Sequence, residues 1–258
     1  MNELRNKIVF ITGASAGIGE ACANLFAEAG ANLILAARRI DKVNKLSDKI
    51  CKKYKVKTKA FKLDVRNNDE VTGTLDSLEE EWKQVDILVN NAGLARGFDK
   101  IYEGKIEHWN EMIDTNIKGL LFVTRWVLPH MVKRKSGHVI NIGSIAGHET
   151  YPSGNVYAAT KFAVNALSKS IRMDVLDKGI KVSSVDPGLV ETEFSLVRFS
   201  GDNNRAKSVY YGLDPLTAND VAETVLFCAT RPHHVNINEI ILTPLAQVSA
   251  VHVHRTTK

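Results

Sequence analysis

The sequence predicts an α/β fold, a doubly wound parallel sheet of seven strands with helices on both faces. Short apolar runs alternate with amphipathic stretches for nearly the whole length, as they do when helices bury both faces of the strands. The 258 residues, 44% hydrophobic and 24% charged, are enough for one large core, and no linker or internal repeat divides them. We therefore expect residues 1–258 to form a single domain.

The predicted strands are apolar runs rich in isoleucine, valine and leucine. They are residues 7–12, 32–37, 57–64, 86–90, 137–143, 181–186 and 237–243. Between them, apolar residues recur at helical spacing over residues 17–29, 41–54, 69–82, 106–135, 155–178 and 217–230. Right-handed crossovers build from this order an open sheet whose ligands bind beyond the carboxyl ends of the strands.

Residues 189–215 are a long stretch without periodicity, and connections of that length in a compact domain are often functional lids. We predict a substrate lid there and a C-terminal tail at about residues 245–258. Much of the net charge of +5 lies in residues 49–62. We interpret this segment as the solvated face of a helix followed by an edge-side strand, rather than as a nucleic-acid site. Three scattered cysteines, and no apolar run of about 18 residues, favour a cytoplasmic protein with no disulfide, metal or membrane partner.

The first strand ends in a glycine-rich turn that opens the next helix, which is the context of a Rossmann dinucleotide-binding fold. Glycines let the backbone approach a pyrophosphate closely, and the N–H groups at the start of the helix receive its charge. A purely structural tight turn is the alternative. The residues concerned are Gly13, Ser15, Ala16, Gly17, Ile18 and Gly19.

The second strand ends in Arg38 and Arg39, where an NAD-preferring site would place a carboxylate on the ribose 2′-hydroxyl. Cations suit a 2′-phosphate, which a carboxylate would repel. The sequence thus predicts NADP(H) as the cofactor, unless the two arginines merely pair with Asp41 on the surface. The ends of the third and fourth strands would border the adenine half of the cofactor through Asp64, Val65, Asn90, Ala92 and Gly93.

Ser144 follows the fifth strand, and Tyr157 and Lys161 lie four residues apart at the start of the next helix. Their spacing places the phenol and the ammonium on one helical face. Because a free tyrosine titrates near about 10, a nearby cation is needed for it to act as an acid/base at neutral pH. Ser144 can donate a hydrogen bond to a developing alkoxide. Ser144, Tyr157 and Lys161 together predict hydride transfer between a nicotinamide and a carbonyl or alcohol. The alternative is that Tyr157 and Lys161 lie on the surface of the helix and that Ser144 belongs to an ordinary turn.

The motifs TGxxxGxG, NNAG and YxxxK, in this order along the chain, resemble those of the short-chain dehydrogenase/reductase family. The resemblance implies that Asn116 is a fourth catalytic residue, supporting a water relay that reaches Lys161. It also implies that a segment after the sixth strand closes over the nicotinamide. Further cofactor contacts would then come from Tyr157, Lys161, Pro187, Gly188, Val190 and Thr192.

The variable part resembles the branch of NADP-dependent 3-hydroxy acid dehydrogenases, through residues 154–157, 193–202 and 234–238. This resemblance implies oxidation of serine, L-allo-threonine, 3-hydroxyisobutyrate or 3-hydroxypropionate, reduction of malonic semialdehyde in reverse, and a homotetramer. Arg198 would either clamp the carboxylate of a substrate held by Ser144 and Tyr157, or anchor the lid. A reductase of other aldehydes, ketones or dicarbonyls, and a non-catalytic NADP(H) sensor, are the alternatives.

Overall fold

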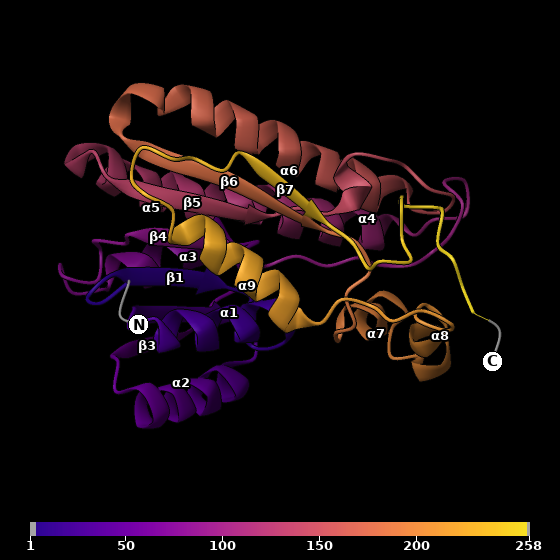
Figure 1. Cartoon of the computed structure of the whole chain (residues 1–258), viewed down its shortest axis with the longest axis horizontal. Coiled ribbons are helices and arrows are strands. Elements are labelled where there is room, and N and C mark those ends of the chain that lie inside the picture. Colours follow the sequence, from indigo (N-terminus) through magenta and orange to yellow (C-terminus); the bar gives the residue numbers. More distant parts are fainter. Residues whose placement is uncertain (1–3, 257–258) are drawn as a thin grey trace.

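The computed structural model describes residues 4–256; residues 1–3 and 257–258, the ends of the predicted domain and tail, lie outside the described residues. The seven strands form one parallel sheet in the spatial order β3-β2-β1-β4-β5-β6-β7 (Figure 1). Neighbouring strands follow falling sequence order from β3 to β1 and rising order from β4 to β7, so the order changes between β1 and β4. The predicted fold class is confirmed. The strands are β1 Ile8–Thr12, β2 Asn32–Ala37, β3 Thr58–Lys62, β4 Ile87–Asn90, β5 Gly137–Ile142, β6 Ile180–Pro187 and β7 Glu239–Leu242.

Helices cover both faces of the sheet, so alternate residues of one strand enter different cores. Val9 and Ile11 of β1 join one apolar cluster, whereas Phe10 joins the other. The first face is covered by α1 Gly17–Glu28, α2 Ile40–Tyr54 and α9 Ala218–Ala229. The second face is covered by α3 Asn68–Asp76, α5 Leu120–Arg134 and α6 Asn155–Asp174. Among residues 4–256, no helix combines the length and apolarity needed to cross a membrane.

Three predicted helices differ from those observed. Residues 106–135 form α4 Ile106–Ile113, a π-helical segment Asp114–Gly119 and α5, rather than one regular helix. The predicted helix 69–82 ends at Asp76, and the Ser77 hydroxyl donates to the Thr74 carbonyl (2.7 Å), a bond that competes with further helix. The predicted helix 155–178 ends as α6 at Asp174, followed by a 3-10 turn Leu176–Lys178.

The 189–215 segment contains two helices, α7 Phe194–Arg198 and α8 Asn203–Ser208, each too short to give a periodic apolar pattern. The C-terminal segment, residues 245–256, folds back against it. Arg255 donates to the carbonyls of Tyr211 (2.6 Å) and Val209 (3.0 Å). Figure 1 shows α7, α8 and the C-terminal segment gathered beyond the carboxyl ends of the strands, where ligands of such sheets bind.

Candidate active site

A cavity of about 890 Å³ lies at the carboxyl ends of the strands. Three of the predicted cofactor-binding and catalytic residues, Gly19, Asn90 and Asn116, do not line it and lie behind its wall. All the others line it: Gly13, Ser15, Ala16, Gly17, Ile18, Arg38, Arg39, Asp64, Val65, Ala92, Gly93, Ser144, Tyr157, Lys161, Pro187, Gly188, Val190 and Thr192. Arg198, the predicted substrate residue, lines the same cavity. The structure thus brings together side chains that are far apart in the sequence.

The glycine-rich turn after β1 forms a backbone cradle that side chains would fill. Gly13 and Gly17 adopt left-handed φ angles of +67° and +56°, which favour glycine. A Cβ on Gly13 would lie 2.9 Å from Asn91 Nδ2, and one on Gly19 would collide with the Gly13 carbonyl oxygen. Gly19 therefore allows α1 to pack closely on the turn. The cradle at the start of α1 fits a pyrophosphate.

The arginines after β2 pair with glutamates rather than with Asp41. Arg39 donates to Ser15 Oγ (3.0 Å) and forms an ion pair with Glu193 (2.7 Å) at the start of α7. Glu193 also pairs with Lys42 (2.8 Å), and the hydrogen bonds from Lys42 and Arg39 lower its pKa. Arg38 Nη1 lies 3.5 Å from Glu111 Oε1. A 2′-phosphate would meet Ser15 and two guanidinium groups here, which are donors suited to it.

The borders of the adenine side differ in their contacts. Asp64 is partly buried and forms a bidentate pair with Arg66 (2.9 Å to Nε), which lowers the pKa of the carboxyl even though burial raises it. Asn90 points into the interior and donates to Thr124 and Asn141, both at 2.9 Å. The neighbouring Asn91, which the sequence analysis did not single out, lines the cavity instead. Asn90 therefore ties β4 to β5 from behind.

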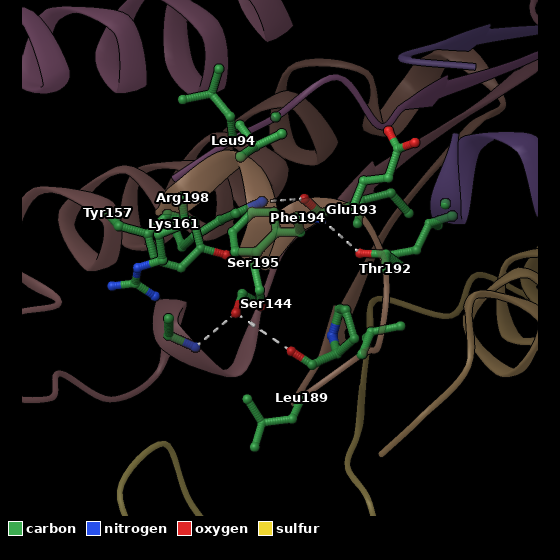
Figure 2. Close-up of a pocket in the computed structure, with 18 of the residues that line it drawn as sticks. Leu94, Ser144, Tyr157, Lys161, Leu189, Thr192, Glu193, Phe194, Ser195 and Arg198 are labelled. Atoms are coloured by element: carbon green, nitrogen blue, oxygen red, sulfur yellow. Dashed lines mark hydrogen bonds between the residues drawn. The ribbon is translucent and has the colours of Figure 1, made fainter. Parts of the chain in front are cut away.

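Ser144, Tyr157 and Lys161 are buried and meet where β5 ends and α6 begins. Ser144 Oγ accepts from the Ala146 N–H (3.1 Å) and donates weakly to the Pro187 carbonyl (3.4 Å). Lys161 Nζ donates to the Ile142 carbonyl (2.9 Å) and lies 5.9 Å from the centroid of the Tyr157 ring. Figure 2 shows Ser144 and Tyr157 around one hollow. The predicted spacing of phenol and ammonium on one helical face is observed.

Burial shifts the pKa values of both Tyr157 and Lys161. It raises the pKa of the Tyr157 phenol far above its usual value, and the Ser144 hydroxyl and Arg198 guanidinium oppose this only in part. It also lowers the pKa of Lys161 to about 8, with Asp186 acting in the opposite direction. The protein alone therefore does not make the phenol acidic, contrary to the simple expectation from the Tyr157–Lys161 pair. Additional positive charge at this end of the cavity would lower the pKa of the phenol.

Asn116 lies in the π-helical segment, and its side chain is hydrogen-bonded to the loop after β4. Its Oδ1 accepts from the Leu94 N–H, and its Nδ2 donates to the Leu94 carbonyl, both at 2.9 Å. A Cβ on Gly93 would lie 3.3 Å from Asn116 Oδ1 and 3.8 Å from Lys161 Nζ. The amide and the ammonium thus flank the same glycine. π-Helical turns are frequent at functional sites, and this one turns the amide toward the cavity wall.

The far end of the cavity is aromatic and carries Arg198. Its Nε donates to the Gly97 carbonyl (3.1 Å) and its Nη1 to Tyr151 Oη (3.0 Å), while its guanidinium lies 4.7 Å from the Phe98 centroid. Phe194 packs on Tyr157 with centroids 5.6 Å apart. No sequence motif predicts these aromatic walls. The C-terminal segment also lines the cavity without such a signal, through Gln247, Ala250, Val251, Val253 and Arg255.

Comparison with known proteins agrees with this architecture. Residues 7–202 match the family model of short chain dehydrogenases, and the chain therefore belongs to this family of oxidoreductases. An NADP-dependent 3-hydroxy acid dehydrogenase of Schizosaccharomyces pombe is 43% identical over 256 residues, 99% of either chain. A sulfoacetaldehyde reductase 2 of Chromohalobacter salexigens is 42% identical over 241 residues, 93% of this chain and 95% of the relative.

A solved structure of the closed form of a serine dehydrogenase complexed with NADP+ is also similar. It has a TM-score of 0.90 and 44% identity, with 96% of this chain and 100% of that chain covered. The family resemblance read from the sequence is confirmed by these matches.

Proposed function

We propose that this chain is an NADP(H)-dependent dehydrogenase that transfers a hydride between the nicotinamide and a small 3-hydroxy acid or β-hydroxy amino acid. The observation that carries the proposal is the meeting of Ser144, Tyr157 and Lys161 with Arg198 in one cavity. The first three suit proton transfer at a carbinol, and a guanidinium suits a carboxylate. The names of the similar proteins, which specify 3-hydroxy acids, serine and NADP, support the same cofactor and substrate class.

In the oxidation direction, Tyr157 takes the proton of the substrate hydroxyl while the hydride leaves the carbinol carbon. Ser144 donates a hydrogen bond to the same oxygen, and Lys161 keeps positive charge beside the phenol. NADP+, when bound, accepts the hydride and adds positive charge that favours the phenolate. Asn116, which flanks Gly93 together with Lys161, would support a proton relay that reaches Lys161.

The cofactor would extend from the glycine cradle to the Tyr157 end of the cavity. Ser15, Arg38 and Arg39 would hold the 2′-phosphate, and Asp64 and Val65 would border the adenine. Ala92 and Gly93, with Asn90 behind them, would border the adenine half of the cofactor as well. The nicotinamide end would be formed by Tyr157, Lys161, Pro187, Gly188, Val190 and Thr192.

The carboxylate of the substrate would bind Arg198, whose Nη2 makes no hydrogen bond to any residue within 4–256. Arg198→Ala is expected to raise KM for carboxylate substrates roughly 10- to 100-fold, the value of a charge-assisted hydrogen bond. Steady-state kinetics with a carboxylate substrate and a neutral ketone of similar size would measure this. Equal losses for both substrates would instead make Arg198 an anchor of the 189–215 segment.

A substrate panel tests the proposed function as a whole. NADP+ reduction is expected with L-serine, L-allo-threonine and 3-hydroxyisobutyrate, and NADPH oxidation with malonic semialdehyde. The 42% identical sulfoacetaldehyde reductase favours a second candidate, the reduction of a short sulfonated aldehyde at the same arginine. Sulfoacetaldehyde therefore belongs in the panel. Turnover of neutral ketones alone would contradict both anionic substrate classes.

We further propose that residues 189–215 act as a lid over the substrate and that the enzyme is a cytoplasmic homotetramer. Val190 pairs with Leu216, and Glu193 reaches Arg39, so both ends of the segment are fixed around the cavity. The free thiols of the cysteines agree with a reducing compartment. Assembly is supported by exposed apolar side chains on α4, α5 and α6, namely Ile106, Ile113, Leu121 and Phe162.

A further inference from the structure

Asp186 is a buried carboxylate that the proton-transfer scheme does not use. It has no exposed surface and lies near the end of β6, directly before Pro187. One carboxylate oxygen accepts from the Ser184 hydroxyl, and the other lies 2.6 Å from His148 Nε2. Burial raises the pKa of the Asp186 carboxyl above its usual value, and the hydrogen bonds with Ser184 and His148 oppose this rise only in part. The ionised form of this carboxylate therefore depends on the polar groups that surround it.

His148 connects Asp186 to the turn of Ser144. The Ser144 side chain caps the start of the 3-10 helix Ile145–Gly147, and His148 is the residue that ends it. The His148 N–H also donates to the Ile145 carbonyl (3.0 Å). The hydrogen bond from His148 to Asp186 therefore fixes the far end of the short turn that begins with Ser144.

The same cluster reaches the helix and strand that hold Lys161. Asn165, one turn after Lys161 on α6, donates to the Gly147 carbonyl and lies 3.1 Å from His148 Nε2. Lys161 itself donates to the Ile142 carbonyl, and a Cβ on the next residue, Gly143, would collide with the carboxylate of Asp186. The carboxylate thus packs directly against the strand end to which Lys161 is bonded.

The charged groups around the cluster come from three elements. Asp186 lies 2.6 Å from Nε2 of His148, which follows the 3-10 helix, and Glu239 of β7 has its Oε1 3.6 Å from the same nitrogen. Lys161 of α6 is the cation of the site, and the charge of Asp186 raises its pKa. His148, Asp186 and Glu239 are also the one group within residues 4–256 whose ligand atoms could hold a metal ion. However, the 2.6 Å separation is that of a hydrogen bond, whereas two ligands of a tetrahedral zinc ion lie about 3.3 Å apart.

We propose that Asp186 is a positioning residue, fixed by His148, which holds the Ser144 turn and supplies the buried negative charge that keeps Lys161 protonated. The inference rests on the proposed role of Tyr157 and Lys161 in proton transfer. An ammonium in a dry site loses its hydration, and a nearby anion restores the preference for the charged form. When Lys161 loses its proton, the phenol of Tyr157 loses the cation that helps it to give up its own.

The pH profile of carbonyl reduction by NADPH tests this inference. Asp186→Asn keeps the shape of the side chain but removes its charge, so the alkaline limb of kcat is expected to move to lower pH by about one unit. His148→Lys leaves Asp186 in place and sets a fixed positive charge beside it, so the limb should move in the same direction. Ser184→Ala, which removes one hydrogen bond and no charge, serves as the matched control and should keep the limb of the wild-type enzyme.

Circular dichroism and NADPH fluorescence would show that each variant is folded and binds cofactor. If the alkaline limb of kcat stays at the wild-type pH in both Asp186→Asn and His148→Lys, even where kcat itself is lower, Asp186 does not act on Lys161 through its charge. A wild-type profile that changes when a chelator removes divalent cations would overturn the inference in favour of a metal site. Neither outcome touches the proposed function, which fails separately if Tyr157→Phe retains its turnover.

Discussion

Tyr157→Phe is expected to lose about 10²- to 10⁴-fold in kcat, the usual contribution of a general acid/base, while it still binds NADP(H). The ring of Tyr157 packs on Phe194 and stays apolar in the variant, so the cavity wall keeps its shape. Only the hydroxyl that exchanges the proton is lost. Single-turnover kinetics together with NADPH fluorescence titration would separate the chemical step from cofactor affinity.

Tyr151→Phe provides a matched control for this variant. Tyr151 lines the same cavity, and its hydroxyl contacts Arg198 rather than Ser144 or Lys161. Its loss is therefore expected to change KM for the substrate more than kcat. Retention of more than about one tenth of the wild-type kcat by Tyr157→Phe would refute the assignment of the acid/base.

Arg38→Glu is expected to weaken NADP(H) binding by about 10²- to 10³-fold, because a donor to the 2′-phosphate becomes a repelling carboxylate. Binding of NAD(H), which has no phosphate there, should change far less. Arg38 Nη1 lies 3.5 Å from Glu111 Oε1, and the Arg38 side chain is half-exposed. The loss of this ion pair should therefore cost little stability. Dissociation constants of both cofactors, measured by fluorescence at one ionic strength for the wild-type chain and the variant, would show how much more affinity is lost for NADP(H) than for NAD(H).

Lys45→Glu is the control for net charge. Lys45 is exposed on α2, does not line the cavity, and its replacement changes the net charge by the same amount. Binding of NADP(H) to this variant should stay close to that of the wild-type chain. Similar losses for NADP(H) and NAD(H) in Arg38→Glu would remove Arg38 from the phosphate site.

The strands along the chain and the position of the site were predictable because they depend on local patterns. Apolar runs such as Ile8–Thr12 mark strands, and motifs at their ends must meet at one edge of a parallel sheet. The break of helix 106–135 at Asp114–Gly119 was not predictable, because both π- and α-helical turns accept the same apolar pattern. The short helices α7 and α8 depend on packing against the rest of the chain rather than on their own periodicity.

The catalytic residues were predictable because Tyr157 and Lys161 are close in the sequence and share a helix. Pairs between distant residues carry no such signal: Arg39 and Glu193 are 154 positions apart, and the one ion-pair partner considered from the sequence, as an alternative to the phosphate site, was Asp41. The direction of the pKa shift of Tyr157 was also missed, because it depends on how deeply the phenol is buried. Burial of a single side chain cannot be read from a helical motif alone.

The return of the C-terminal segment to the cavity has a practical consequence for work with this enzyme. The Gln247 side chain accepts from the Leu189 N–H (2.8 Å), and Arg255 is bonded to the turn after α8. An affinity tag or fusion partner attached at that end would therefore follow directly on residues that line the cavity, and it is expected to disturb the measured rates. β1 begins at the amino ends of the strands, on the side of the sheet away from α7 and α8 (Figure 1), so a tag at the amino end is expected to disturb the measured rates less.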